Sequence, residues 1–203
     1  MVKIKICGIT SKEDALKAVY YGAWAVGFVF HKKSPRYISP SRVKKIVEEL
    51  PPFVSVVGVF VNLKEGAVRD ICKFCHIHTM QFHGDETPAF CLRFKDAKVI
   101  KAFRVDNAFN LEQIKRYKVD AYLFDTYKEN TYGGTGQSFN WNLLKSVKLE
   151  KPYILSGGLN SENIQQALQT LSPYAVDVSS GIENFPGVKN YTLMRTFCDL
   201  VNN

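Results

Sequence analysis

Short apolar segments that recur at regular intervals constrain the fold of this chain more than any other feature of its sequence. Eight of them occur, at residues 2–7, 24–30, 54–61, 78–83, 98–103, 120–125, 152–156 and 174–178. They are rich in Val, Ile, Phe and Tyr, and several are apolar nearly throughout, which indicates strands that are buried on both faces. The sequence therefore predicts eight strands of a parallel sheet.

The segments between these strands begin with helix start signals and continue at helical spacing. Thr10 and Glu13 fit a capping box, and Ser39 precedes Pro40 at a first helical position. Further start signals are Asn62 with Glu65, Thr87 with Pro88, Asn110 with Gln113, and Asn160, and the last helix carries Leu193, Met194, Phe197 and Val201 on one stripe. This alternation implies parallel strands joined by right-handed crossovers.

Length and loop sequences decide between a closed barrel and an open doubly wound sheet. The chain has 203 residues, and eight strand–helix units need at least about 200 residues to close into a barrel. An open doubly wound sheet that binds a dinucleotide carries a glycine-rich fingerprint after its first strand. This chain has no such fingerprint there, which favours the closed barrel. We therefore expect an α/β fold, a single-domain (β/α)8 TIM barrel of parallel strands over residues 1–203.

The bulk composition argues against several classes of protein. No apolar run approaches the ~20 residues of a membrane span, and the N-terminus lacks the apolar stretch of a secretory signal, so we expect a cytoplasmic protein. Five cysteines without a framework pattern indicate reduced thiols. The net charge of +8 comes without a long basic block, so it indicates a lysine-rich surface, or attraction of a small polyanion, rather than nucleic-acid binding.

Two of the predicted strands end in groups that can move a proton. Cys7 ends the first strand and Asp125 ends the sixth, and the carboxyl ends of barrel strands all face one mouth. A thiolate base and a protonated carboxylic acid are a matched pair for an isomerisation. The alternatives are a buried apolar thiol at Cys7 and a helix cap at Asp125.

Small-residue loops follow the last three predicted strands. Gly157 and Gly158 follow the seventh and Gly181 the eighth, where many barrels hold a phosphate on free backbone N–H groups. The loop after the sixth, with Gly133, Gly134, Thr135 and Gly136, matches neither a P-loop nor a dinucleotide loop. We interpret it as a lid, with a flexible connector as the alternative.

Two further side chains are placed to bind substrate. Arg36 follows the second strand, and its guanidinium suits a carboxylate. His83 ends the fourth strand, at the mouth, where it could hydrogen-bond the substrate. Each has a simpler reading, as a solvated loop arginine and a structural histidine.

Signatures spread over nearly the whole chain resemble the phosphoribosylanthranilate isomerase family. In order they are Lys5–Thr10, Gly27–Phe30, Ser34–Ile38, Gly58–Asn62, Gln81–Gly84, Gly133–Gly136, Leu155–Leu159 and Asp177–Gly181. One departure is Phe82, where the family usually has leucine. The resemblance implies a (β/α)8 barrel that acts on a small phosphorylated substrate without cofactor, metal or nucleic acid, as a monomer or a homodimer.

The resemblance also implies roles for individual residues. Cys7 matches the general base, Asp125 the general acid, and Arg36 the partner of the anthranilate carboxylate. The candidate substrate-binding residues are Arg36, His83, Gly157, Gly158, Asp177, Ser179, Ser180 and Gly181. The implied reaction is an Amadori rearrangement of N-(5-phosphoribosyl)anthranilate to 1-(2-carboxyphenylamino)-1-deoxyribulose 5-phosphate, in tryptophan biosynthesis.

Other readings of the same sequence are weaker. A sugar-phosphate epimerase or an indole-glycerol-phosphate synthase would use clustered histidines or a lysine–glutamate pair in place of Cys7 and Asp125. A nucleic-acid-binding module would show a steep salt dependence. Cys72, Cys75 and His76 match a haem-attachment pattern without the export signal it needs. Zinc bound by Cys72, Cys75 and His78 would lack a fourth ligand.

Overall fold

Eight parallel strands close into a barrel in chain order, with β1 paired to both β2 and β8. The computed structural model describes residues 1–106, 109–126, 140–145 and 149–203. The strands are β1 (Lys3–Cys7), β2 (Ala25–Val29), β3 (Ser55–Phe60), β4 (Thr79–Phe82), β5 (Lys98–Val105), β6 (Ala121–Thr126), β7 (Tyr153–Leu155) and β8 (Ala175–Val178). The predicted barrel is confirmed.

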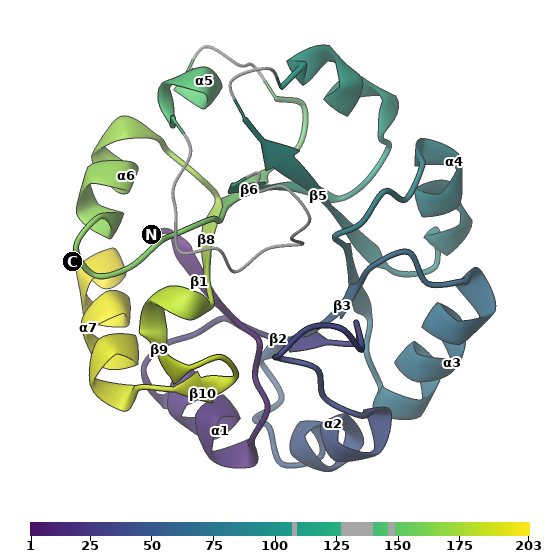
Figure 1. Cartoon of the computed structure of the whole chain (residues 1–203), viewed down its shortest axis with the longest axis horizontal. Helices are drawn as coiled ribbons and strands as arrows, with labels where there is room; N and C mark the ends of the chain where they lie inside the picture. The colour runs from purple at the N-terminus through teal and green to yellow at the C-terminus, as the bar shows by residue number, and fades with distance from the viewer. Residues whose placement is uncertain (107–108, 127–139, 146–148) are drawn as a thin grey trace.

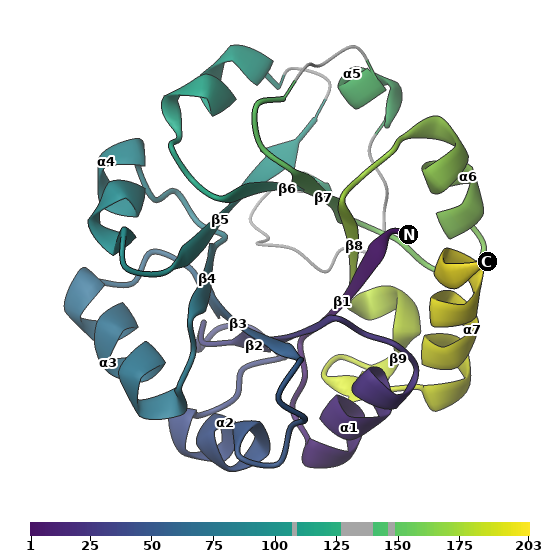
Figure 2. The same ribbon diagram turned by 180° about the vertical axis from the view of Figure 1, so that it is seen from behind.

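Helices surround the barrel on its outside, as the two axial views show (Figures 1 and 2). They are α1 (Lys12–Tyr20), α2 (Pro40–Val47), α3 (Glu65–Cys75), α4 (Pro88–Cys91), α5 (Asn142–Lys145), α6 (Ile164–Thr170) and α7 (Tyr191–Asn202). Short 3₁₀ helices add η1 (Leu92–Phe94), η2 (Leu111–Arg116) and η3 (Ser180–Ile182), and a hairpin of β9 (Glu183–Phe185) and β10 (Val188–Lys189) follows η3.

The residues that point into the barrel change from apolar to polar along the strands. Val57, Ile100, Ala102, Leu123, Ile154 and Ala175 form a separate buried apolar cluster. Because side chains alternate along a strand, the residue two positions further points the same way. Asp125 therefore follows Leu123 and Asp177 follows Ala175 toward the carboxyl ends of their strands. The barrel interior is therefore apolar at the level of this cluster, and buried polar groups line its mouth at the carboxyl ends of the strands.

Three of the predicted helix start signals are confirmed. The side chain of Thr87 accepts a hydrogen bond from Phe90 N at the start of α4, with Pro88 in the first turn. Asn110 accepts from Glu112 N at the start of η2. Ser39 is the N-cap of α2, although its hydroxyl makes no capping hydrogen bond.

Other start signals were wrong in detail. Ser11 rather than Thr10 caps α1, by accepting from Asp14 N at 3.1 Å, while the Thr10 hydroxyl donates to the carbonyl of Gly187. Lys64 rather than Asn62 is the N-cap of α3, because Asn62 lies in the left-handed region at φ 52°.

Two more expectations near the C-terminus need correction. Asn163 is the N-cap of α6, and the Asn160 side chain accepts from the backbone N–H groups of Glu162 and Asn163 in the preceding turn. On α7, Leu193 is 38% exposed, and Cys198 joins Met194, Phe197 and Val201 on the buried stripe in its place.

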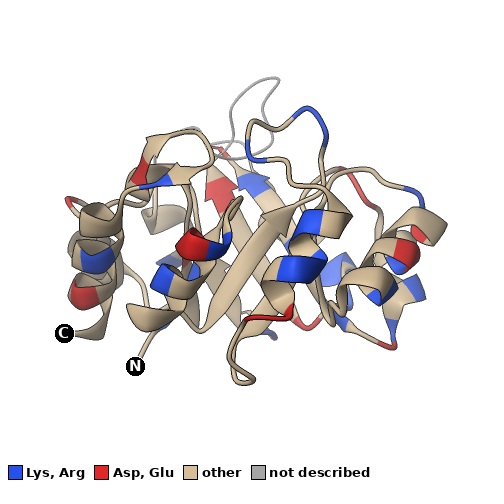
Figure 3. Ribbon diagram, turned by 90° about the horizontal axis from the view of Figure 1, so that it is seen from below, with Lys and Arg blue, Asp and Glu red and all other residues tan. Residues whose placement is uncertain are grey.

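Charged residues of both signs lie on the helices around the barrel, and the strands run toward one end of it (Figure 3). Of the helices in the described residues, none combines the length and the apolar character required to cross a membrane.

Candidate active site

The first strand brings an ammonium group and a thiol together. Lys5 and Cys7 are 3% and 8% exposed, and both side chains lie against Gly27 of the neighbouring β2. A Cβ atom at position 27 would lie 2.9 Å from the sulfur and 3.2 Å from the Lys5 nitrogen. A glycine is therefore required there, since any larger residue would displace the pair.

Lys5 is held on its other side by a carboxylate. Its Nζ lies 2.8 Å from Oδ1 of Asp177, which is itself buried on β8. The Ser156 hydroxyl lies 3.5 Å from Oδ2 of the same carboxylate. Sequence analysis placed Asp177 among the substrate contacts, whereas in the structure its direct partner is Lys5.

The electrostatics of Cys7 are set by two opposing effects. Burial raises the pKa of the Cys7 thiol above its ordinary value of 9.0, and the Lys5 ammonium acts against this rise. Burial likewise acts to lower the pKa of Lys5, but Asp177 and Cys7 outweigh it, so that pKa is raised. Lys5 therefore stays charged, and Cys7 is mostly a thiol at neutral pH with its stabilising cation already beside it.

The sixth strand presents Asp125 within a set of donors. Asp125 is 3% exposed, and its Oδ1 accepts a hydrogen bond from Thr126 N at 2.8 Å. Its Oδ2 lies 3.0 Å from Nε2 of His83. Gly157, at φ 87°, packs against this carboxyl group, and a Cβ there would lie 2.8 Å from Oδ1.

The Arg36 side chain binds a carboxylate that follows the last barrel strand and is not a freely solvated loop arginine. Its Nε and Nη2 donate to both oxygens of Glu183, at 2.9 Å and 2.6 Å for the closest contacts. Lys189 binds the same carboxylate at 2.8 Å and donates to the carbonyl of Cys7 at 2.6 Å. Glu183 therefore accepts from Nε and Nη2 of Arg36 and leaves Nη1 outside this contact.

The pKa values within this group follow from burial and charge. Burial acts to raise the pKa of Glu183, but the hydrogen bond from Arg36 and the charge of Lys189 outweigh it and lower that pKa. Burial lowers the pKa of Lys189, and the Glu183 carboxylate only partly offsets this. Glu183 is therefore the anion that holds the buried Lys189 and the partly buried Arg36 together.

The glycine loops after β7 and β8 lie against each other. Gly157 and Gly158 have positive φ angles of 87° and 65°, and Gly181 packs against the backbone of Leu159. Ser179 approaches Gly8, where a Cβ would lie 2.8 Å from the serine hydroxyl and 2.6 Å from Cδ of Arg36. The loops after β1, β2, β7 and β8 thus meet at one side of the mouth.

The mouth therefore joins Cys7 and Asp125 through a continuous set of buried groups. Lys5, Asp177 and Ser156 lead from Cys7 to Gly157, which lies against Asp125. Sequence analysis missed Lys5 and Gln81, which the two-residue strand period relates to Cys7 and His83. It also missed Glu183 and Lys189, for which no local signal exists.

Two sequence interpretations remain outside this picture. The proposed lid, Gly133, Gly134, Thr135 and Gly136, lies outside the described residues. Cys72 and Cys75 are buried on α3, with pKa values raised by burial to about 12 and about 11. Within the described ranges, no three His, Cys, Asp or Glu side chains are grouped so that they could hold a metal ion.

Comparison with known proteins shows which family of proteins this chain is similar to. A family model described as N-(5'phosphoribosyl)anthranilate (PRA) isomerase matches residues 4–200. The N-(5'-phosphoribosyl)anthranilate isomerase of Geobacter sulfurreducens is 48% identical over 197 residues, which cover 97% of this chain and 97% of that protein. The crystal structure of phosphoribosyl anthranilate isomerase from Thermotoga maritima has a TM-score of 0.90 and 41% identity, covering 100% of this chain and 99% of that one.

A further crystal structure adds a ligand to the comparison. It is a phosphoribosyl anthranilate isomerase in complex with reduced 1-(o-carboxyphenylamino)-1-deoxyribulose 5-phosphate, with a TM-score of 0.84 and 38% identity over 100% of this chain and 99% of that one. The family model and these relatives span almost the whole sequence. The chain belongs to the N-(5'-phosphoribosyl)anthranilate isomerase family.

Proposed function

We propose that this protein converts N-(5'-phosphoribosyl)anthranilate to 1-(2-carboxyphenylamino)-1-deoxyribulose 5-phosphate, with Cys7 as general base and Asp125 as general acid. The observation that carries the proposal is the buried thiol and buried carboxyl group at one mouth, linked by the groups between them. The relative in complex with the reduced form of this product supports the choice of substrate.

The proposed reaction needs one acid and one base. Asp125 protonates the ribose ring oxygen, and the ring opens to an iminium. Cys7 then removes the proton on C2 of the sugar, which gives an enolamine that tautomerises to the product. The Lys5 ammonium stabilises the negative sulfur that this step requires.

The anionic ends of the substrate would meet the two halves of the mouth. Nη1 of Arg36 is available for the anthranilate carboxylate, because Glu183 occupies only Nε and Nη2. The phosphate would bind at Gly157, Gly158, Ser179, Ser180 and Gly181, where glycines allow close approach to backbone N–H groups.

Turnover by matched variants tests the two roles. Loss of substrate fluorescence after mixing with N-(5'-phosphoribosyl)anthranilate reports the reaction. We expect Cys7→Ser and Asp125→Asn each to reduce turnover by about 100-fold or more, the usual effect of losing a general acid or base. Cys198→Ser, a buried thiol on α7, is the control and should retain turnover. Near-normal turnover in either site variant would contradict its role.

A further inference from the structure

His83 lies between two buried polar side chains at the barrel mouth. Its Nδ1 is 2.8 Å from Nε2 of Gln81, which is two residues earlier on β4 and fully buried. Its Nε2 is 3.0 Å from Oδ2 of Asp125 across the mouth. Gln81, His83 and Asp125 thus form a row of hydrogen-bonded side chains that ends at the proposed general acid.

The Gln81 amide determines where the ring proton lies. An amide nitrogen can only donate, so Nδ1 of His83 accepts, and a neutral ring then carries its proton on Nε2. That N–H is directed at Oδ2 of Asp125, while Thr126 N donates to Oδ1. Of these two donors to Asp125, only the Nε2–H of His83 belongs to an ionisable side chain, since the other is a backbone N–H.

The other end of the Gln81 amide has no partner. Its Oε1 is buried and makes no hydrogen bond among the described residues. Turning the amide by 180° would therefore break no second hydrogen bond, and it would let Oε1 accept from a proton on Nδ1. The same side chain can thus hold His83 with one ring proton or with two.

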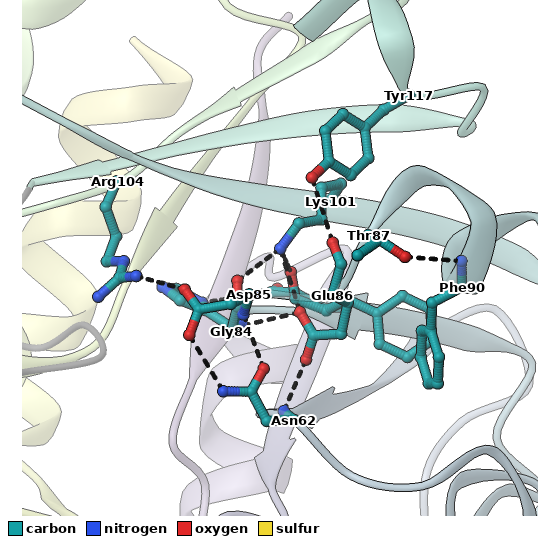
Figure 4. Close-up of polar contacts among 12 residues, drawn as sticks. Asn62, Gly84, Asp85, Glu86, Thr87, Phe90, Lys101, Arg104 and Tyr117 are labelled. Carbon is teal, nitrogen blue, oxygen red and sulfur yellow. Dashed lines mark hydrogen bonds and ion pairs between the residues drawn. The ribbon is translucent and has the colours of Figure 1, made fainter. Parts of the chain in front are cut away.

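The backbone that carries His83 is fixed by a buried ion pair (Figure 4). Lys101 on β5 donates to the carbonyl of Gly84 at 2.7 Å and lies 3.1 Å from Glu86. Glu86 accepts in turn from Gly84 N and from Asn62 N, at 2.9 Å and 2.8 Å. The residue directly after His83 is therefore held on both its N–H and its C=O, so the ring is positioned by rigid neighbours.

We propose that His83 is the proton partner of Asp125, so that the proton given to the substrate is drawn from the His83–Asp125 hydrogen bond while Gln81 fixes the ring. This rests on the proposed function. It assigns His83 to the acid rather than to direct contact with the substrate, and it assigns Gln81 a positioning role.

The proton transfers balance as follows. In the loaded pair, both ring nitrogens of His83 carry protons and Asp125 is a carboxylate. The Nε2–H bond breaks as an O–H bond forms on Oδ2, and that bond breaks in turn as the substrate ring oxygen gains the proton. The neutral ring keeps its proton on Nδ1, on the turned Gln81 amide. In the final tautomerisation, C1 gains the proton that Cys7 removed from C2, and the hydroxyl proton of C2 passes to Oδ2 of Asp125 and on to Nε2, which reloads the pair.

Charged groups around His83 are paired with each other. From β5, Lys101 is bound to Glu86 and Arg104 to Asp85, at 3.1 Å and 2.7 Å. From β6, Asp125 faces the ring directly. Asp125 is therefore the ionisable side chain in direct contact with the ring.

Single-turnover kinetics separate a proton partner from a fixed donor. In His83→Gln an amide N–H can still donate to Asp125 but cannot be transferred, whereas His83→Leu removes the donor as well. We expect both variants to lower the single-turnover rate about 100-fold, with substrate affinity changed ~3-fold or less. His78→Gln, at the exposed opposite end of β4, is the control. A His83→Gln rate within ~3-fold of the parent rate would overturn the proposal.

The ring state gives a readout that needs no turnover. The chain contains four histidines, so 15N-histidine labelling with His83→Gln for assignment identifies the His83 signals. We expect a ring that carries a proton on Nε2 in the parent protein and a loss of this preference in Gln81→Met. A ring without a proton on Nε2 in the parent would overturn the proposal. If the protein fails to act on N-(5'-phosphoribosyl)anthranilate, this spectrum still decides the state of the ring.

Discussion

At the scale of single residues, Cys7, the proposed base, shows how neighbouring side chains shift the pKa of a buried thiol. Burial raises the pKa of its thiol, Lys5 opposes that rise, and the Asp177 carboxylate adds to it. The same strand period that points Lys5 and Cys7 inward also brings Asp177 of β8 beside them, because β1 and β8 pair at Lys5 and Asp177. The ionisation of the Cys7 thiol therefore depends on two side chains, Lys5 and Asp177, that shift its pKa in opposite directions.

This arrangement predicts opposite changes from two substitutions. Lys5→Met should raise the pKa of Cys7 by removing its cation, whereas Asp177→Asn should lower it by removing a neighbouring anion. Since the thiolate is the reactive form, alkylation of Cys7 by iodoacetamide should slow in the first variant and quicken in the second at a fixed pH near 8.5. Peptide mapping resolves Cys7 from Cys198, whose pKa is about 12. Equal alkylation rates in the two variants would contradict this account.

The same tuning predicts how activity depends on pH. If Cys7 is the base, the rising limb of kcat/KM reports its ionisation, and burial places that limb above the ordinary thiol range of 9.0. Activity should therefore still rise as the pH increases from 7 to 9. In Lys5→Met the limb should move further toward alkaline pH, and a profile that is flat over this range would argue against a thiolate base.

Single residues also mark the limit of sequence analysis. The positions of Cys7 and Asp125 at the mouth could be predicted because each ends an apolar strand of the predicted barrel. Glu183 and Lys189 could not, because their partners Arg36 and Cys7 lie 147 and 182 residues away along the chain. Only the closed barrel brings these side chains together, and no local pattern encodes that contact.

At the scale of elements, the strands could be predicted closely and the helix starts less so. Each observed barrel strand overlaps a predicted apolar segment, because burial on both faces leaves a clear pattern. Two strands, β5 and β6, extend past their predicted ends, to Val105 and Thr126. At the start of α1, the hydroxyl of the predicted cap, Thr10, donates to the carbonyl of Gly187, and Ser11 accepts from Asp14 N instead. A tertiary contact therefore occupies the side chain that the sequence pattern favours as the cap.

The two serine caps give a matched test of this point. Ser11→Ala should lower the free energy of unfolding by about 1 kcal/mol, because it leaves the Asp14 N–H without its partner. Ser39→Ala should change the free energy of unfolding by only about 0.3 kcal/mol, since Ser39 makes no capping hydrogen bond. Urea unfolding of both variants measures the difference, and equal losses would show that the hydroxyl bond is unimportant.

The buried ion pair of Lys101 and Glu86, which holds the backbone of Gly84 after β4, predicts a larger effect on stability. Lys101 and Glu86 are 3% and 2% exposed in their side chains, whereas Lys115 and Glu112 form a pair at 66% and 70%. Removing one partner of a buried pair typically costs about 3–5 kcal/mol, and an exposed pair contributes ~1 kcal/mol or less. Lys101→Met should therefore strongly reduce the free energy of unfolding in urea, and Lys115→Met should hardly change it. If Lys101→Met lowered the free energy of unfolding only slightly, the buried pair would not be important for stability.

At the scale of the whole molecule, the barrel is closed by polar contacts as well as by β1–β8 pairing. Glu183 follows the last barrel strand, Arg36 follows the second, and Lys189 binds the carbonyl at the end of the first. A single carboxylate therefore ties the final unit of the chain to its first two units. The integrity of the fold and the position of Cys7 and Arg36 depend on the same group.

Glu183 also gives the fold a pH dependence with a definite sign. Its pKa is lower in the folded protein than the ordinary 4.5, because Arg36 and Lys189 outweigh burial. Its stabilising contribution is therefore complete above about pH 4.5 and is lost as the pH falls through the folded-state pKa. Glu183→Gln removes the charge and should cost about 2 kcal/mol at pH 7. Urea unfolding at several pH values should show the gap between parent and variant closing below pH 4.5; a gap that is constant with pH would mean that the charge of Glu183 does not hold the ends of the barrel together.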